Sequence, residues 1–177
     1  MGDIVDTIKS KVVGKIETPD ELLTFKLGSA LRMEHKVLGM LHKLEQEAQR
    51  SELKQQFSHH AEETRGQIEN LEQAFSALGA TADEKPCLPI DAIDAEGTAN
   101  IKMAGDGLVD AVILSGAAET EHFEMAVYES LITIAESMGK DDVARLMREN
   151  LQQEEHTLEE VTKAMRQVAP AMSQAAG

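Results

Sequence analysis

The chain of 177 residues carries 32 acidic and 17 basic side chains, a formal net charge of −15 at pH 7. This length predicts one domain with a sizeable core, and an apolar content of 42% argues against wholesale disorder. The negative charge makes nucleic acids and anionic membranes poor partners and favours cations. The single cysteine, Cys87, excludes an intrachain disulfide framework and a four-thiolate metal site. Because neither a signal-peptide pattern nor an apolar run of membrane-spanning length is evident, we expect a cytoplasmic protein that does not bind or span a membrane.

The first part of the sequence predicts a short segment and two long helices. Residues 1–17 are expected to form a short N-terminal amphipathic segment. The run TPDE, which begins at Thr18, combines a capping threonine, a proline at the first helical position and a glutamate three residues after the cap. It predicts the start of a helix that runs to about Arg50. A second helix is expected over 51–78, capped by its first serine and ended by the glycine that follows it.

The second part predicts a long connection and two more long helices. Residues 80–90 contain two prolines and are expected to form a loop, followed by a short, weaker helix over 91–104. The third long helix is expected over 108–138, ended by a glycine, and the fourth over 141–168, capped by its first aspartate. Residues 170–177 begin with a proline and are expected to be a flexible tail.

These elements predict an all-α protein with a ferritin-like architecture. Strong helix formers dominate the long stretches between the four prolines, whereas β-branched and aromatic residues are sparse. Short turns make each pair of long helices an antiparallel hairpin, and the long connection can run the length of the bundle. A four-helix bundle whose two hairpins are joined by one long crossover has the ferritin-like topology. We therefore expect this bundle over residues 18–169, with the short helix lying in the crossover.

The apolar stripe of each long helix is interrupted near its middle by a carboxylate or an imidazole. A helix of a bundle should present apolar residues at spacings of three and four. With antiparallel neighbours and a rise of 1.5 Å per residue, the interruptions fall within about two turns of one another along the axis. The pattern therefore predicts one polar cluster inside the bundle, made of Glu34, His60, Glu63, Glu121, Glu124 and Glu154.

Such a cluster requires positive charge. Five carboxylates in a low-dielectric core cannot all stay ionised unaided, because burial and like charges both oppose ionisation. The four stripes contain no lysine or arginine, so divalent cations are the expected partners. The i,i+3 pairs His60/Glu63 and Glu121/Glu124 place two ligands on one helix face, as a dinuclear carboxylate site requires. Oxygen-rich ligation with one imidazole suits iron or manganese better than structural zinc.

The sequence pattern leaves some alternatives open. The third long helix also contains Glu119-x-x-His122, an ExxH pattern whose row is less apolar, so the Glu121/Glu124 phase is preferred. Tyr128, the only tyrosine, lies one turn after Glu124 and is expected either to hydrogen-bond a metal-bound oxygen or to pack in the core. His59 and His156 lie close in sequence to proposed ligands and are candidates to support them.

Several runs of the sequence resemble a known family. FSHHAEETRGQIENLEQAFSALG, a Lys-Pro-Cys loop, TEHFEMAVYESL and LQQEEHTLEEV are similar to the YciE/YciF-type ferritin-like proteins of bacteria, over most of residues 20–168. The resemblance implies a dimeric four-helix bundle, a role in stress response and a dinuclear iron site at the six residues named above. The chain departs from the general di-iron pattern of ExxH on two helices, because the second long helix carries HxxE and the fourth has Thr157 three residues after Glu154. It also departs from relatives of this type, which have an acidic residue where this chain has Leu158.

The expected function is that of a dinuclear metal-binding protein, with iron as the expected metal, that reacts with O2 or peroxide as a ferroxidase or peroxide scavenger. Two alternatives use the same features differently. A dimanganese catalase-like enzyme would use the same ligand types with manganese. A non-enzymatic helical stress-associated homodimer would keep its interior glutamates hydrated.

Overall fold

The computed structural model describes residues 15–105 and 107–172, which form helices without a β-strand. The helices are α2 (Pro19–Glu47), α3 (Ser51–Ala77), α4 (Leu88–Met103), α5 (Val109–Ser137) and α6 (Asp141–Met172). The all-α prediction is therefore confirmed. The predicted amphipathic segment over 1–17 lies almost entirely outside the described residues. Within the described part of the chain, no helix combines the length and apolar character needed to cross a membrane.

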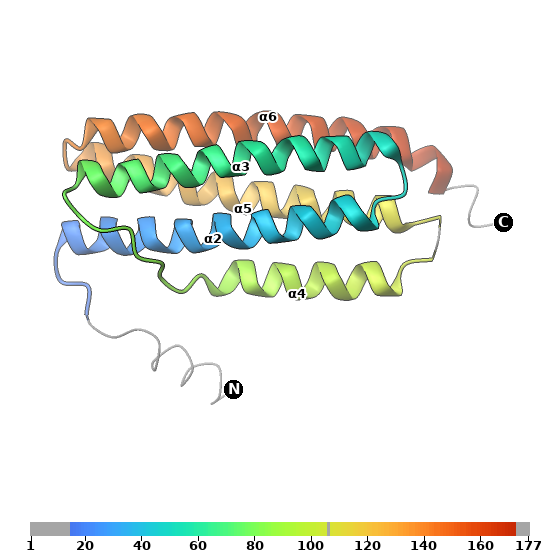
Figure 1. Ribbon diagram of the computed structural model, residues 1–177, viewed down its shortest axis with the longest axis horizontal. Helices are drawn as coiled ribbons and strands as arrows, with labels where there is room; N and C mark the ends of the chain where they lie inside the picture. Colours follow the sequence, from blue (N-terminus) through green and yellow to red (C-terminus); the bar gives the residue numbers. More distant parts are fainter. Residues whose placement is uncertain (1–14, 106, 173–177) are drawn as a thin grey trace.

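The four long helices form a bundle with α4 along its side (Figure 1). α2 packs against α3 and α5, and α6 packs against the same two helices, so each long helix has two long neighbours. Adjacent long helices run antiparallel (Figure 1). After α3 ends, α4 carries the chain back along the side of the bundle to the start of α5 (Figure 1). This arrangement is the predicted pair of hairpins joined by a long crossover with a short helix.

The crossover is fixed to α2 at Gly28. The backbone N–H of Lys85 donates to the carbonyl of Gly28 at 2.9 Å. A Cβ atom at position 28 would lie 2.4 Å from the carbonyl oxygen of Asp83, so only glycine allows this approach. The contact places the start of α4 beside α2 and α5, where Cys87 is buried in the core.

Several helix ends follow from the sequence. The Thr18 hydroxyl accepts from the Glu21 N–H at 3.2 Å, while the Glu21 carboxylate accepts from the Thr18 N–H at 3.0 Å, which confirms the capping box. Gly79 and Gly139 both have φ of +66°, as expected for residues that end a helix in the left-handed conformation.

Other ends differ from the prediction. α2 ends at Glu47, and three residues separate it from α3. Ser51 is the first helical residue of α3 and not its cap, because Arg50 holds the cap position. The Ser51 hydroxyl donates to the Glu52 carboxylate instead. α4 begins at Leu88, since a proline is well accommodated in a first helical turn. α6 continues through Pro170 to Met172. A proline so close to the end of a helix removes one terminal hydrogen bond, and its φ is compatible with the helix.

The interior consists of two apolar regions separated by a polar layer. At the end where α2 begins, the buried residues include Leu23, Leu27, Leu71, Phe75, Leu131 and Met147. Toward the other end they include Leu41, Leu53, Phe57, Ile113 and Val161. The polar residues of the four stripes lie between these regions.

Candidate metal centre

The helix phases place the predicted ligand residues toward the bundle interior. Glu34 of α2, Glu124 of α5 and Glu154 of α6 are fully buried, and His60 and Glu121 are nearly so. Glu63 is the exception, with 21% of its side chain exposed. Glu119 and His122, the alternative pair on α5, are exposed.

Four of the six residues converge on one point. One ligand atom from each of His60, Glu121, Glu124 and Glu154 can be chosen so that all four lie within 4.8 Å of one another. Three helices supply them, α3, α5 and α6. This donor set of three carboxylates and one imidazole is the kind that iron or manganese accepts.

Glu34 and Glu63 lie outside this group of four. One oxygen of Glu34 accepts a hydrogen bond from the Tyr128 hydroxyl, which draws that carboxylate toward α5. Glu63 Oε2 lies 3.6 Å from His60 Nδ1, and Glu63 Oε1 lies 3.7 Å from Nε2 of the exposed His59. The two residues therefore occupy positions beside the four-residue group.

Many polar atoms of the cluster have no hydrogen-bond partner among the residues described. They are Oε2 of Glu34, Glu121 and Glu154, both carboxylate oxygens of Glu124, and Nε2 of His60. Buried polar atoms are nearly always paired in folded proteins, and these carboxylate oxygens and this imidazole nitrogen are atoms of the kind that ligate a cation. No lysine or arginine of residues 15–105 and 107–172 forms an ion pair with the four buried carboxylates. The residues present thus fit a divalent cation.

Burial controls the titration of these carboxylates. It raises the pKa of Glu34 to about 7, in spite of the hydrogen bond from Tyr128, which lowers it. Burial also raises the pKa values of Glu124 and Glu154 well above the usual range, and the charges of neighbouring carboxylates add to the effect. In the absence of a cation, the cluster therefore binds protons at pH values where exposed glutamates are ionised.

The direction of the pKa shift of His60 is set by its carboxylate neighbours, and not by burial. Burial lowers its pKa, but its contacts with the carboxylates of Glu121 and Glu63 outweigh burial, so its pKa is raised well above the usual value. Its Nε2 lies 3.4 Å from Glu121 Oε1 without the alignment of a hydrogen bond. The imidazolium thus supplies one positive charge to the carboxylates. A metal ion bound by the neutral imidazole would supply positive charge in its place.

Polar residues that the sequence pattern did not single out hold the carboxylates and Tyr128 in place. Gln67 Nε2 donates to Glu154 Oε1 at 2.6 Å. Asn150, one turn before Glu154, donates to the Tyr128 hydroxyl at 3.0 Å and accepts from Asn70 at 2.8 Å. Their signal in the sequence was a buried-phase amide one turn from a predicted ligand, on α3 for Gln67 and on α6 for Asn150.

Thr157 occupies the position where a histidine would complete an ExxH motif. Its hydroxyl lies 3.4 Å from His60 Nδ1, within hydrogen-bond distance. Thr157 therefore orients the imidazole and offers no ligand of the strength of a histidine. The departure from the general pattern leaves one imidazole, His60, in the cluster.

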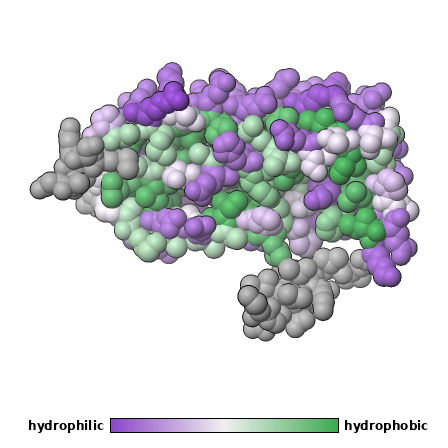
Figure 2. All heavy atoms as spheres, turned by 180° about the vertical axis from the view of Figure 1, so that it is seen from behind, coloured by the Kyte–Doolittle hydropathy of each residue, from purple (hydrophilic) through white to green (hydrophobic). Residues whose placement is uncertain are grey.

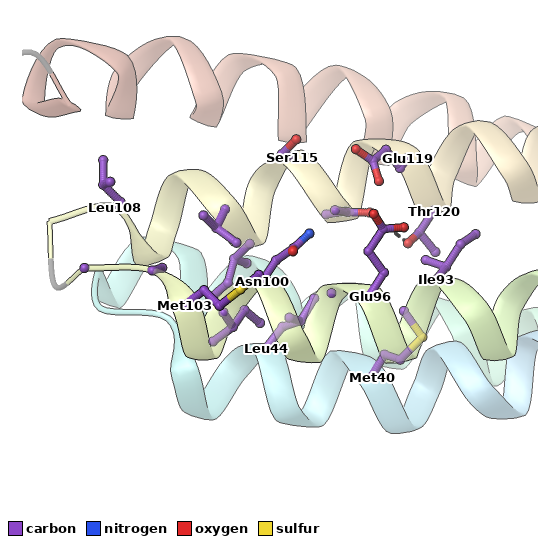
Figure 3. Close-up of a pocket in the computed structure, with 18 residues that line it drawn as sticks. Met40, Leu44, Ile93, Glu96, Asn100, Met103, Leu108, Ser115, Glu119 and Thr120 are labelled. Atoms are coloured by element: carbon purple, nitrogen blue, oxygen red, sulfur yellow. Dashed lines mark hydrogen bonds between the residues drawn. The ribbon is translucent and has the colours of Figure 1, made fainter.

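A separate hollow of about 380 Å³ lies between α2, α4 and α5. Met40, Leu44, Met103, Leu108 and Thr120 are among the residues around it (Figure 3). Apolar residues are visible among the hydrophilic ones on the face of the molecule shown in Figure 2. Met103, at the end of α4, is 75% exposed. None of the six predicted ligands lines this hollow.

Comparisons with known proteins agree with the fold. A family model described as a domain of unknown function, DUF892, matches residues 18–174. Protein YciF of Escherichia coli K12 is 29% identical over 144 residues, which cover 80% of this chain and 87% of YciF.

Solved structures of similar proteins superpose closely. The protein YcfI of Rhodopseudomonas palustris is 32% identical with a TM-score of 0.82, over 84% of this chain and 95% of that one. The structure of the E. coli stress protein YciF is 25% identical with a TM-score of 0.82, over 88% and 99% of the respective chains. A protein of Xanthomonas campestris pv. campestris, at 21% identity and a TM-score of 0.72 over 89% of this chain and 98% of that one, shares the fold.

Proposed function

The chain belongs to the DUF892 family, to which it is matched over residues 18–174, and from this premise we propose that it is a stress-response protein that binds iron inside its bundle. The stress role is inferred from the similarity to the E. coli stress protein YciF. The observation that supports metal binding is the convergence of His60, Glu121, Glu124 and Glu154 with unpaired ligand atoms. The protein is proposed to act in the cytoplasm.

We assign the six residues as follows. His60, Glu121, Glu124 and Glu154 hold a first ion, and Glu34 and Glu63, which lie beside them, complete a dinuclear centre. Bound iron would supply redox chemistry toward O2 or peroxide. The chain contributes the fixed positions of the carboxylates, through Gln67 on Glu154 and Tyr128 on Glu34. The apolar regions on either side keep bulk water away from the layer.

A homodimer is part of the same proposal. Met103 and Leu108, at the turn from α4 to α5, are exposed apolar side chains beside the hollow between α2, α4 and α5, and exposed apolar patches favour protein contacts. Light scattering on the purified chain should give twice the mass of 19.3 kDa.

Anaerobic loading with Fe(II), followed by O2 or peroxide, tests the iron proposal. The wild-type protein should retain iron through gel filtration. It should oxidise Fe(II) faster than Fe(II) is oxidised in buffer alone, with a charge-transfer absorbance. The variant Glu121→Gln/Glu154→Gln should do neither. The variant Glu119→Gln/Glu155→Gln is the matched control, because it removes two exposed carboxylates close in sequence to the buried ones.

A metal content well below one ion per chain, with no absorbance change, would remove the proposal. Manganese is distinguished from iron by its activity. Evolution of oxygen from peroxide by the manganese-loaded protein, but not by the iron-loaded protein, would favour the dimanganese catalase-like alternative.

A further inference from the structure

The four-residue group is closed to solvent, which raises the question of how a cation reaches it. The side chains of His60 and Glu121 are only 4% and 3% exposed, and Glu124 and Glu154 are fully buried. Of the six proposed ligands, Glu63 alone is substantially exposed. An ion that enters without unfolding the bundle would therefore first meet Glu63.

A continuous series of ligand atoms runs through Glu63 from the surface to the cluster. His59 Nε2 lies 3.7 Å from Glu63 Oε1, and the other oxygen of Glu63 lies 3.6 Å from His60 Nδ1. His60 Nε2 then lies 3.4 Å from Glu121 Oε1. Side-chain exposure falls along the series, from 68% at His59 to 21% at Glu63 and 4% at His60. Each step is short enough for an ion to contact two ligands at once, after small side-chain movements.

The outer end of the series opens on a recess in the surface. His59 lines a hollow of about 350 Å³ between α3 and α6, together with Gln55, Gln56, Glu160 and Lys163. Glu160 also contacts the exposed His156, at 3.8 Å. Lys163 is the cationic side chain in this lining, and it forms no ion pair with Glu63 among the described residues.

The other side of the cluster offers no comparable path among the residues described. Glu34 is fully buried, and its hydrogen bond from Tyr128 is backed by Asn150, which is also fully buried. The hollow beside α4 contains no ligand residue of the cluster in its lining. Metal-ligating atoms thus connect the cluster to solvent through α3.

We propose that His59 and Glu63 form a relay on α3 through which divalent cations pass between the solvent and the buried metal centre. His59 captures the hydrated ion, and the two oxygens of Glu63 transfer it to His60, whose imidazolium releases a proton to solvent as the ion arrives. The inference rests on the proposed function, because it presupposes that the cluster binds a cation. It predicts a kinetic role for His59, which is absent from the set of six ligands.

The relay is tested by stopped-flow mixing of Co²⁺ with the full-length, chelator-stripped protein, followed through the absorbance of the bound ion. His59→Leu should slow loading about tenfold, the lower end of the range for which local electrostatics and ligand concentration alter association rates. Chelator-driven release should slow by the same factor, so that the dissociation constant stays unchanged. A residue on the path changes both rates equally, whereas a ligand of the final site changes the affinity.

Two further variants make the result specific. His59→Asp restores a metal-binding side chain and should recover most of the loading rate, which a purely structural role of His59 would not allow. His122→Leu removes another exposed histidine next to a buried ligand and should load like the wild type. Equal loading rates in wild type and His59→Leu, or equal slowing in His122→Leu, would overturn the relay. A wild-type protein that takes up no Co²⁺ would instead refute the proposed metal centre, and the relay with it.

Discussion

The polar layer of the bundle and the hollow beside α4 are both spaces between helices, but they are lined by opposite chemistry. Glu124, in the polar layer, is fully buried, and neither of its carboxylate oxygens has a hydrogen-bond partner among the described residues. The hollow is bordered largely by apolar side chains and by Gly97 and Gly116, at which a Cβ atom would meet nothing within 4 Å.

The difference concerns what each region needs from a ligand. The polar layer has a free-energy deficit in the metal-free chain, because buried polar groups without hydrogen-bond partners are costly whether they are ionised or protonated. The hollow has only unfilled space, whose cost is the packing that is missing. A cation should therefore act strongly on the polar layer and leave the hollow unaffected.

Substitution of Glu124 by leucine should have the largest effect, with opposite signs in the two states of the protein. In the metal-free protein, Glu124→Leu should raise the free energy of unfolding by about 1–4 kcal/mol, because leucine replaces a buried carboxyl group that has no hydrogen-bond partner within the described part of the chain with apolar volume. In the wild type, saturating metal at 100 times its dissociation constant should add about 2.7 kcal/mol. The variant should lose most of this gain.

Urea denaturation with and without Mn²⁺ measures both effects. Glu119→Leu, an exposed position on the same helix, is the control and should respond to metal like the wild type. A metal-free Glu124→Leu protein less stable than the wild type would mean that the carboxylate is already compensated inside the chain.

The stability of the metal-free protein should depend on pH in a direction set by the same layer. An unfolded glutamate loses its proton near pH 4.5, whereas Glu34 keeps its proton in the folded state up to about pH 7. The folded state therefore binds more protons in this interval, and the free energy of unfolding falls as the pH rises. Glu124, Glu154 and His60, whose pKa values are also raised, act in the same direction.

Thermal unfolding followed by circular dichroism in the presence of a chelator should give a lower Tm at about pH 8 than at about pH 5. Glu63, whose pKa is lowered chiefly by its contact with His60, acts in the opposite sense, but only as the pH falls below its usual range. Mn²⁺ should remove most of the difference between the two pH values. A chelated protein that is more stable at the higher pH would contradict the account of the buried carboxylates.

The smallest effect is expected at the hollow. Gly116→Ala adds a methyl group inside α5, about two turns after its start, where the structure leaves room for it. The substitution should stabilise the protein by about 0.5–1 kcal/mol, because glycine loses more conformational freedom than alanine when a helix forms. Calorimetry should show the same gain with and without metal. A change in metal affinity would show that the two regions are coupled.

Helical periodicity was sufficient to predict the bundle and the inward phase of the cluster. Glu121 and Glu124 are buried while Glu119 and His122 are exposed, which follows from the 3.6-residue repeat and the apolar residues on either side. These are properties of single helices, so one sequence contains them. The capping box at Thr18 is predictable for the same reason.

Contacts between helices were not predictable in this way. That Tyr128 engages Glu34, and that Gln67 holds Glu154, depends on side-chain rotamers and on the relative rotation of two helices. From the sequence alone, Gln67 is equally consistent with a residue at the solvent-exposed edge of the apolar stripe. The continuation of α6 through Pro170 is a balance between one lost hydrogen bond and the packing around Val168, which local sequence rules do not include.

The metal content of the protein, isolated under anaerobic conditions from the organism that makes it, tests the central claim most directly. Elemental analysis after extensive dialysis should find iron at about two ions per chain, the stoichiometry of a dinuclear carboxylate centre. The Glu121→Gln/Glu154→Gln variant prepared in parallel should contain almost none. A wild-type protein with no more bound iron, manganese or other divalent metal than that variant would contradict the account.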